Sequence, residues 1–152
     1  MKETRRIAKL LEDIYQGSPW IDVCLMSTVK NISAGQAAAK VSPNWNSIWE
    51  ILNHLISWRL TVLQRVQDTV IPSPANNYFA PVNDTSDEAW QLTLQKLEDS
   101  QQQWMLLLKK FKKKDLEKTY PGNDMTYYEH IQGIIQHDAY HLGQIVLLAK
   151  GI

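Results

Sequence analysis

The stretch TYYEHIQGIIQHDAYHLGQIVLLA, residues 126–149, contains the clearest structural signal in the chain. Its apolar residues recur three and four positions apart, which is the period of one face of an α-helix. Thr126 and Glu129 have the spacing of a capping box at the start, and Gly151 is placed to end the helix. The pattern predicts one long helix that buries one of its faces.

The N-terminal part of the chain predicts two helical pieces separated by a break. An apolar face marks the first piece, and residues 17–19 interrupt it. Ser18 can cap a second piece, with a proline directly after it, and this piece is predicted to reach about Asn31. Residues 32–46 are predicted to form a connection with one short turn near 36–38. The apolar face of the first piece consists of Ile7, Leu10, Leu11 and Ile14.

Two more capping boxes predict two further long helices. The boxes pair Ser47 with Glu50 and Thr85 with Glu88. The first of these helices should end near Gln67, and the proline-rich residues 68–84 should form a long loop. The second has an apolar stripe in which Gln101 is the one polar member. A turn region over residues 115–124 then leads to the last helix.

These segments predict an all-α protein, a four-helix bundle formed by a single domain over residues 1–152. No segment shows the alternation of a strand, and 152 residues is an ordinary length for one domain. The long connection between helices two and three can travel the length of a bundle, at about 3.3 Å per residue. Helices two and three could therefore run parallel, unlike the neighbours in an up-and-down bundle.

Composition argues against several classes of function. Sixteen basic and sixteen acidic residues cancel, which gives no electrostatic reason to expect nucleic acid or an anionic membrane as a partner. No apolar run approaches the roughly 18 residues needed to cross a bilayer. Cys24 is the only cysteine, so no internal disulfide can form, and its apolar surroundings predict a core residue. We expect a soluble, cytoplasmic protein.

Three of the four histidines fall on helix faces that are predicted to be buried. His137 and His141 are one turn apart on the same face, so both imidazoles can reach one ion. His54 lies between Ile51 and Trp58 on the apolar stripe of another helix. A buried imidazole needs partners for its nitrogens, and a shared metal ion would supply them. Separate hydrogen bonds for each ring are the alternative, and spacing alone does not distinguish the two.

A three-histidine site would leave coordination positions open, as catalytic metal sites do. Histidine ligation suits zinc, nickel, iron or copper, and zinc and nickel are the first candidates. The run HDAYH, residues 137–141, has aspartate where an H-E-x-x-H peptidase has its glutamate base, and the Glu-x-x-His pairs of a di-iron bundle are absent. His130, two turns before His137, is predicted to be structural or at the surface.

Two motifs resemble the DinB-like (YfiT-like) superfamily. One is SIWEILNH, residues 47–54, with Trp58 after it, and the other is GIIQHDAYHLGQI, residues 133–145. The GSPW break at residues 17–20 is similar to a subset of the same family. The resemblance covers nearly the whole chain. Its most specific feature is the H-x-x-x-H pair with Gly-Gln just beyond it.

The resemblance implies a four-helix bundle, often in a homodimer, with helices two and three running in the same direction. It also implies one divalent transition metal ion bound by His54, His137 and His141. Some members are metal-dependent transferases of low-molecular-weight thiols such as bacillithiol, or mycothiol-dependent isomerases. By resemblance we expect a metal-dependent enzyme acting on a small molecule, with thiol S-transferase as the first hypothesis.

Other functions stay open at the level of the sequence. A metal-dependent hydrolase would activate water instead of a thiol, and a metal-binding or dimerisation module would have no turnover. Asp138 is rotated about 100° from His137, so it is predicted to support a ligand or to make a salt bridge. The tryptophans, which could be core or a dimer interface, include Trp45, Trp49, Trp90 and Trp104. The side chains predicted to line a pocket are Trp58, Tyr127, His130 and Gln144.

Overall fold

The computed structural model describes residues 2–152, and every regular element in that range is helical, as predicted. The long helices are α1 (Glu3–Tyr15), α4 (Ile48–Arg65), α5 (Asp87–Lys110) and α6 (Tyr127–Ala149). The short pieces are α2 (Leu25–Val29), α3 (Ala34–Ala38) and the 3-10 helix η1 (Lys113–Glu117). Over these residues the β-type pairing is one antiparallel bridge between Thr119 and Thr126. Within the same range, no helix combines the length and the apolar character needed to span a membrane.

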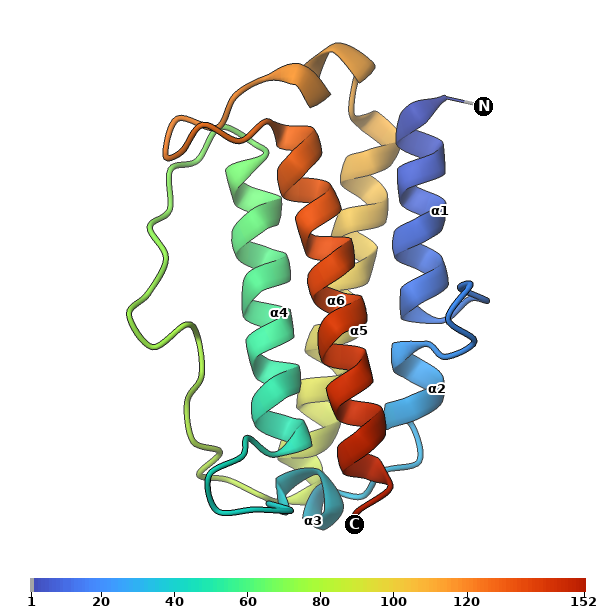
Figure 1. The fold of residues 1–152 in the computed structure, drawn as a ribbon, viewed down its shortest axis with the longest axis vertical. Coiled ribbons are helices and arrows are strands. Elements are labelled where there is room, and N and C mark those ends of the chain that lie inside the picture. Colours follow the sequence, from blue (N-terminus) through green and yellow to red (C-terminus); the bar gives the residue numbers. More distant parts are fainter. Residues whose placement is uncertain (1) are drawn as a thin grey trace.

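The long helices lie side by side, two in each direction (Figure 1). Helices α4 and α5 run the same way, and α1 and α6 run the opposite way. Residues 66–86, which join α4 to α5, pass along the length of α4 on its outer side. Helix α4 packs against α5 and α6, and α1 packs against the same two helices. The long connection therefore lies where it can cover one face of α4.

Local sequence signals set the helix starts. The capping boxes predicted at Ser47 and Thr126 are both present, each with its glutamate three residues later. The box predicted at Thr85 is wrong, because Ser86 caps α5 and accepts a hydrogen bond from a backbone N–H three residues later at 3.2 Å. The N–H of Ser86 itself donates to Oδ1 of Asp84 at 3.0 Å. This Asx turn places Ser86 at the cap position.

The helix predicted from Ser18 to Asn31 is also wrong. Regular helix in that stretch is limited to α2, and residues 17–24 form an irregular turn. Asp22 has a φ of 62°, a left-handed conformation that a helix cannot pass through. Helical hydrogen bonding starts where the N–H of Thr28 donates to the carbonyl of Cys24 at 3.2 Å. Cys24 is buried, as predicted.

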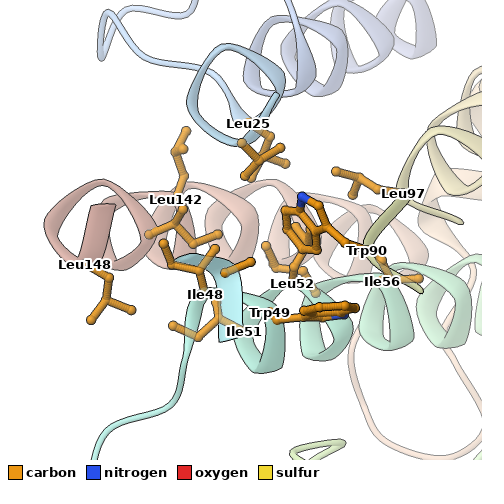
Figure 2. Packing of buried hydrophobic residues seen from close by; sticks show 14 of the residues in the cluster. Leu25, Ile48, Trp49, Ile51, Leu52, Ile56, Trp90, Leu97, Leu142 and Leu148 are labelled. Carbon is orange, nitrogen blue, oxygen red and sulfur yellow. The ribbon is translucent and has the colours of Figure 1, made fainter. Parts of the chain in front are cut away.

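Within residues 2–152, the buried apolar residues form two clusters. One gathers around Trp49 and Trp90, whose rings meet edge to face with centroids 5.0 Å apart (Figure 2). The other gathers around Trp104. These three tryptophans are at most 2% exposed, so they belong to the core and not to an interface. Trp20 and Trp45, by contrast, are 97% and 58% exposed.

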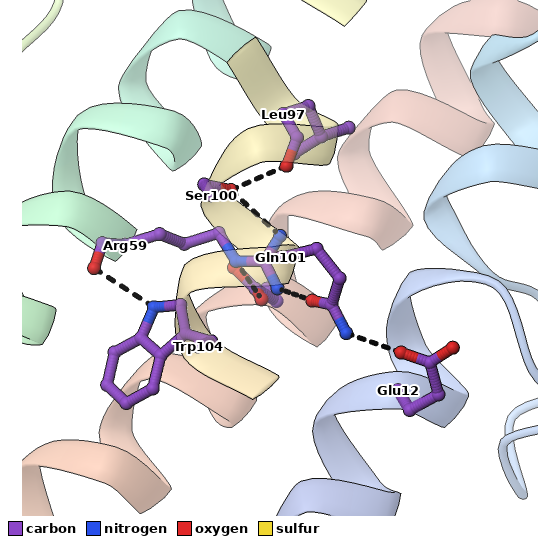
Figure 3. Close-up of polar contacts among 7 residues, drawn as sticks. Glu12, Arg59, Leu97, Ser100, Gln101 and Trp104 are labelled. Carbon is purple, nitrogen blue, oxygen red and sulfur yellow. Dashed lines mark hydrogen bonds and ion pairs between the residues drawn. The ribbon is translucent and has the colours of Figure 1, made fainter. Parts of the chain in front are cut away.

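Polar side chains of the long helices contact one another in a layer (Figure 3). Along each of these helices the polar residues lie between members of one apolar cluster and members of the other. Nε of Arg59 on α4 lies 3.2 Å from Oδ2 of Asp138 on α6, and both side chains are 0% exposed. The same guanidinium donates to Oγ of Ser100 at 3.4 Å and to the side-chain oxygen of Gln101 on α5. Gln101 in turn donates to Glu12 of α1 at 2.7 Å. This layer links α1, α4, α5 and α6 through side-chain contacts. It also gives Gln101, the one polar member of the α5 stripe, hydrogen-bond partners inside the protein.

Candidate metal centre

Three imidazole rings meet where α4 faces α6. Nε2 of His54 lies 2.9 Å from Nε2 of His137 and 3.1 Å from Nε2 of His141. The spacing explains the meeting, because His137 and His141 are one turn apart on α6 and His54 lies on the buried stripe of α4. The ligand atoms of the three rings all lie within 4.8 Å of one another, so they could hold one metal ion.

Oxygen acceptors occupy the outer nitrogen of two of these rings. Nδ1 of His54 lies 2.6 Å from the carbonyl oxygen of Asn77, and Nδ1 of His141 lies 2.7 Å from Oε1 of Gln144. Because a carbonyl oxygen can only accept, each Nδ1 carries the proton and each Nε2 presents a lone pair to the centre. Nδ1 of His137 is buried and has no hydrogen-bond partner among residues 2–152.

Burial keeps the three rings neutral at pH 7. The pKa of His137 is lowered to about 3, first by burial and then by the neighbouring His141 and His54 rings. Burial also lowers the pKa of His141 and the pKa of His54, although the Asn77 carbonyl partly raises the latter. Neutral imidazole is the form that ligates a metal ion.

The donor set fits a divalent transition metal. Two imidazole nitrogens on one tetrahedral zinc ion lie roughly 3.3 Å apart, given Zn–N distances of about 2.0–2.1 Å. The observed separations of 2.9 and 3.1 Å are close to that value. Without a cation, the lone pairs of His54 and His141 would face each other 3.1 Å apart in a buried site, and an Nε2–H of His137 would donate to His54 alone, at 2.9 Å. The arrangement therefore suits a shared cation better than three separately bonded rings.

Residues of the long connection cover the centre. The ring of Phe79 stacks on His54, with centroids 4.0 Å apart and planes at 8°. Nε1 of Trp58 donates to Oδ1 of Asn77 at 2.9 Å, and the Trp58 ring meets Tyr78 edge to face with centroids 5.2 Å apart. Sequence reasoning missed Asn77 and Phe79. The proline-rich residues 68–84 indicated only a loop, and a contact made by a backbone carbonyl has no side-chain signature.

Of the side chains predicted to line a pocket, Trp58 and Gln144 contact the centre, and Tyr127 and His130 do not. The ring centroid of Trp58 lies 6.4 Å from that of His137. Tyr127 and His130 instead contact loop side chains at 2.6 and 3.3 Å. Burial raises the pKa of Tyr127 to about 12, and burial lowers the pKa of His130. Both side chains therefore belong to the packing around η1 and its neighbouring loops.

Asp138 follows His137 in sequence, but its side chain is buried in the protein interior. It pairs there with Arg59, as predicted for a salt bridge. Burial raises the pKa of Asp138 to about 6, against the lowering effect of the Arg59 guanidinium. Asp138 thus ties α6 to α4 directly beside the ligand candidates.

The sequence profile of the DinB superfamily matches residues 25–145. This match spans most of the chain and includes all three clustered histidines, so the chain belongs to the DinB superfamily. No curated protein and no solved structure matches the chain. The family and the histidine cluster together are compatible with a metal-binding protein.

Proposed function

We propose that this chain is a metal-dependent enzyme in which His54, His137 and His141 bind one divalent transition metal ion. The observation that carries the proposal is the convergence of one ligand nitrogen from each of three imidazoles, all within 4.8 Å of one another. Two of these rings have Nδ1 bonded to an oxygen acceptor. Membership of the DinB superfamily supports it. Zinc and nickel are the ions we propose first, because neutral imidazole donors suit both.

The surroundings of the rings support a catalytic role. A bound metal ion supplies Lewis-acid chemistry, lowering the pKa of a thiol or a water molecule that reaches it. Three protein ligands leave room for such a group. As a whole residue, His137 is only partly buried whereas His54 and His141 are buried, so we propose that a small-molecule substrate approaches from the His137 side. The Phe79 ring stacks on His54 and covers that side of the centre, whereas the Trp58 ring lies beside His137, with centroids 6.4 Å apart.

The resemblance to family members that act on thiols favours a thiol over water as the nucleophile. Asp138, the carboxylate nearest in sequence, is held in the interior by Arg59 and is not available as a general base. A thiol has a pKa of about 8.5, so a metal ion would convert it to a thiolate at pH 7 without a base. Metal-bound water, with a pKa of about 7, would not need a base either, so the choice between the two rests on the family resemblance. We therefore propose a low-molecular-weight thiol S-transferase, with metal-dependent hydrolysis as the alternative.

Cobalt substitution tests this proposal. Small thiols added to the cobalt-loaded Cys24→Ser protein should produce an intense near-ultraviolet charge-transfer band, and the substitution removes the only protein thiol. A response to azide but not to thiols would favour the hydrolase. No response to thiols, azide or cyanide would mean that the ion has no exchangeable coordination position. The chain would then be a metal-binding module without turnover.

We also propose that residues 1–152 form one four-helix bundle domain that assembles as a homodimer in the cytoplasm. The polar layer that joins all four long helices supports a single bundle. Tyr140 and Leu147, which are 64% and 70% exposed, lie two turns apart on α6 and offer an apolar surface for a second copy. Light scattering that gave a single-chain mass of 17.6 kDa at high micromolar concentration would contradict the dimer.

A further inference from the structure

We propose that the backbone carbonyl of Asn77 is a positioning group for His54, and that residues 76–79 are an integral part of the metal centre. This inference rests on the proposed function, because it assigns how one of the three ligand rings is oriented. The carbonyl accepts a hydrogen bond from Nδ1–H of His54 at 2.6 Å. Nε2 of His54 is then unprotonated, and its lone pair faces the other two rings.

The tautomer of His54 decides whether its ring can ligate at all. A neutral histidine in water carries its proton mostly on Nε2, which is the nitrogen that faces the centre here. A proton at that position would block ligation. The Asn77 carbonyl reverses the preference by giving the proton a partner on Nδ1. The stacked Phe79 ring prevents the imidazole from turning away.

The carbonyl is held in place by an unusual backbone conformation. Asn77 and Tyr78 have φ values of 52° and 58°, both in the left-handed region that residues with a side chain rarely adopt. The N–H of Tyr78 donates to Oδ1 of Asn76 at 3.1 Å, which stabilises this turn. Rotating either residue back to negative φ would swing the intervening peptide plane, and the carbonyl oxygen would leave His54.

Side-chain bonds fasten the same turn to α4. Nε1 of Trp58 donates to the side-chain oxygen of Asn77 at 2.9 Å. The hydroxyl groups of Tyr78 and Thr61 are 2.8 Å apart. Because Trp58 and Thr61 lie on the same helix as His54, these bonds fix the position of the turn relative to the ring. These contacts account for the place of Trp58 beside the centre without any contact to a substrate.

The tautomer can be measured without any substitution. Long-range ¹⁵N–¹H NMR correlation of the metal-free parent should show His54 protonated on Nδ1 and bare on Nε2. The reverse assignment, or a mixture dominated by the Nε2–H form, would overturn the inference. This measurement does not depend on whether the protein binds metal.

A matched pair of variants tests the role of the carbonyl in affinity. Tyr78→Gly and Tyr78→Val both remove the phenol, but only glycine tolerates the φ of 58°. Tyr78→Val should shift the His54 proton toward Nε2 and weaken zinc binding by about 10–100-fold, measured by competition with a chromophoric chelator. Tyr78→Gly should stay closer to the parent in both measurements. Equal zinc affinity and equal tautomers in the two variants would refute the proposal.

His137→Ala separates this inference from the proposed function. If His137→Ala binds zinc as tightly as the parent, the metal centre itself is wrong. If His137→Ala loses zinc while Tyr78→Val keeps parental affinity, the centre stands and the positioning role of Asn77 fails. Far-ultraviolet circular dichroism should be unchanged in both Tyr78 variants, since residue 78 lies outside the helices.

Discussion

Replacing Asp138 by asparagine should destabilise the protein strongly, because it leaves the Arg59 guanidinium charged and uncompensated. The paired atoms are 3.2 Å apart and both side chains are 0% exposed. At an effective dielectric constant of about 20, the attraction at that distance is about 5 kcal/mol, part of which offsets the cost of desolvation. Breaking a buried pair on one side typically costs about 3–5 kcal/mol.

Urea unfolding followed by tryptophan fluorescence measures this cost. With a slope of about 2 kcal/mol per molar urea, the midpoint of Asp138→Asn should fall by about 1.5–2.5 M. The experiment is run with a chelator present, since a bound metal would add its own stabilisation. Arg59→Met should cost less, because a lone Asp138 can become protonated.

The double variant Arg59→Met, Asp138→Asn isolates the interaction. It removes both charges, so its cost should fall short of the sum of the two single costs by about 1.5–3 kcal/mol. Arg6→Met is the matched control, since Arg6 pairs with Glu3 at 3.6 Å and its side chain is 65% exposed. That control should cost less than about 1 kcal/mol. A cost below about 1 kcal/mol for Asp138→Asn, or additive single costs, would refute the reasoning.

Two further predictions concern helix starts and alkaline pH. Ser47→Ala removes an acceptor 3.1 Å from the N–H of Glu50 and should cost about 1 kcal/mol in urea unfolding, whereas an unchanged midpoint would mean that the cap is dispensable. Burial raises the pKa of Tyr127 from 10.0 to about 12, so the folded state holds this proton after the unfolded state has lost it. The contribution of this proton to the free energy of unfolding is fully present below pH 10 and is lost as the pH rises toward about 12. The unfolding free energy of the parent should therefore fall more steeply over that range than that of Tyr127→Phe, and parallel curves would contradict this assignment.

The fold was predictable wherever one local signal dominated. The boxes at Ser47 and Thr126 each specify a helix start because the side chain and the backbone of the same turn satisfy each other. The start of α5 was misplaced by one residue because Thr85 and Ser86 are both competent caps, and the Asp84 turn selects between them. The helix expected after Ser18 failed because the left-handed conformation of Asp22 has no signature in the apolar pattern.

For the candidate metal centre, the sequence predicted the three histidine side chains but not the backbone carbonyl that contacts one of them. Periodicity places His54, His137 and His141 on buried faces, and the structure brings the three rings together. The Asn77 carbonyl could not be found in the same way, because every residue carries a carbonyl and only the path of the long connection places this one. The interior position of Asp138 depended on Arg59 of another helix, a pairing that sequence distance conceals.

Zinc binding by chelator-stripped protein is the most direct test of the central claim. Isothermal titration should give one zinc ion per chain for the parent, with the stoichiometry checked by elemental analysis. His54→Ala, His137→Ala and His141→Ala should each lose most of the affinity, while His130→Ala, which removes the one histidine outside the cluster, should bind as the parent does. Parental affinity in any of the three cluster variants, or loss of binding in His130→Ala alone, would contradict a metal centre built from these three rings.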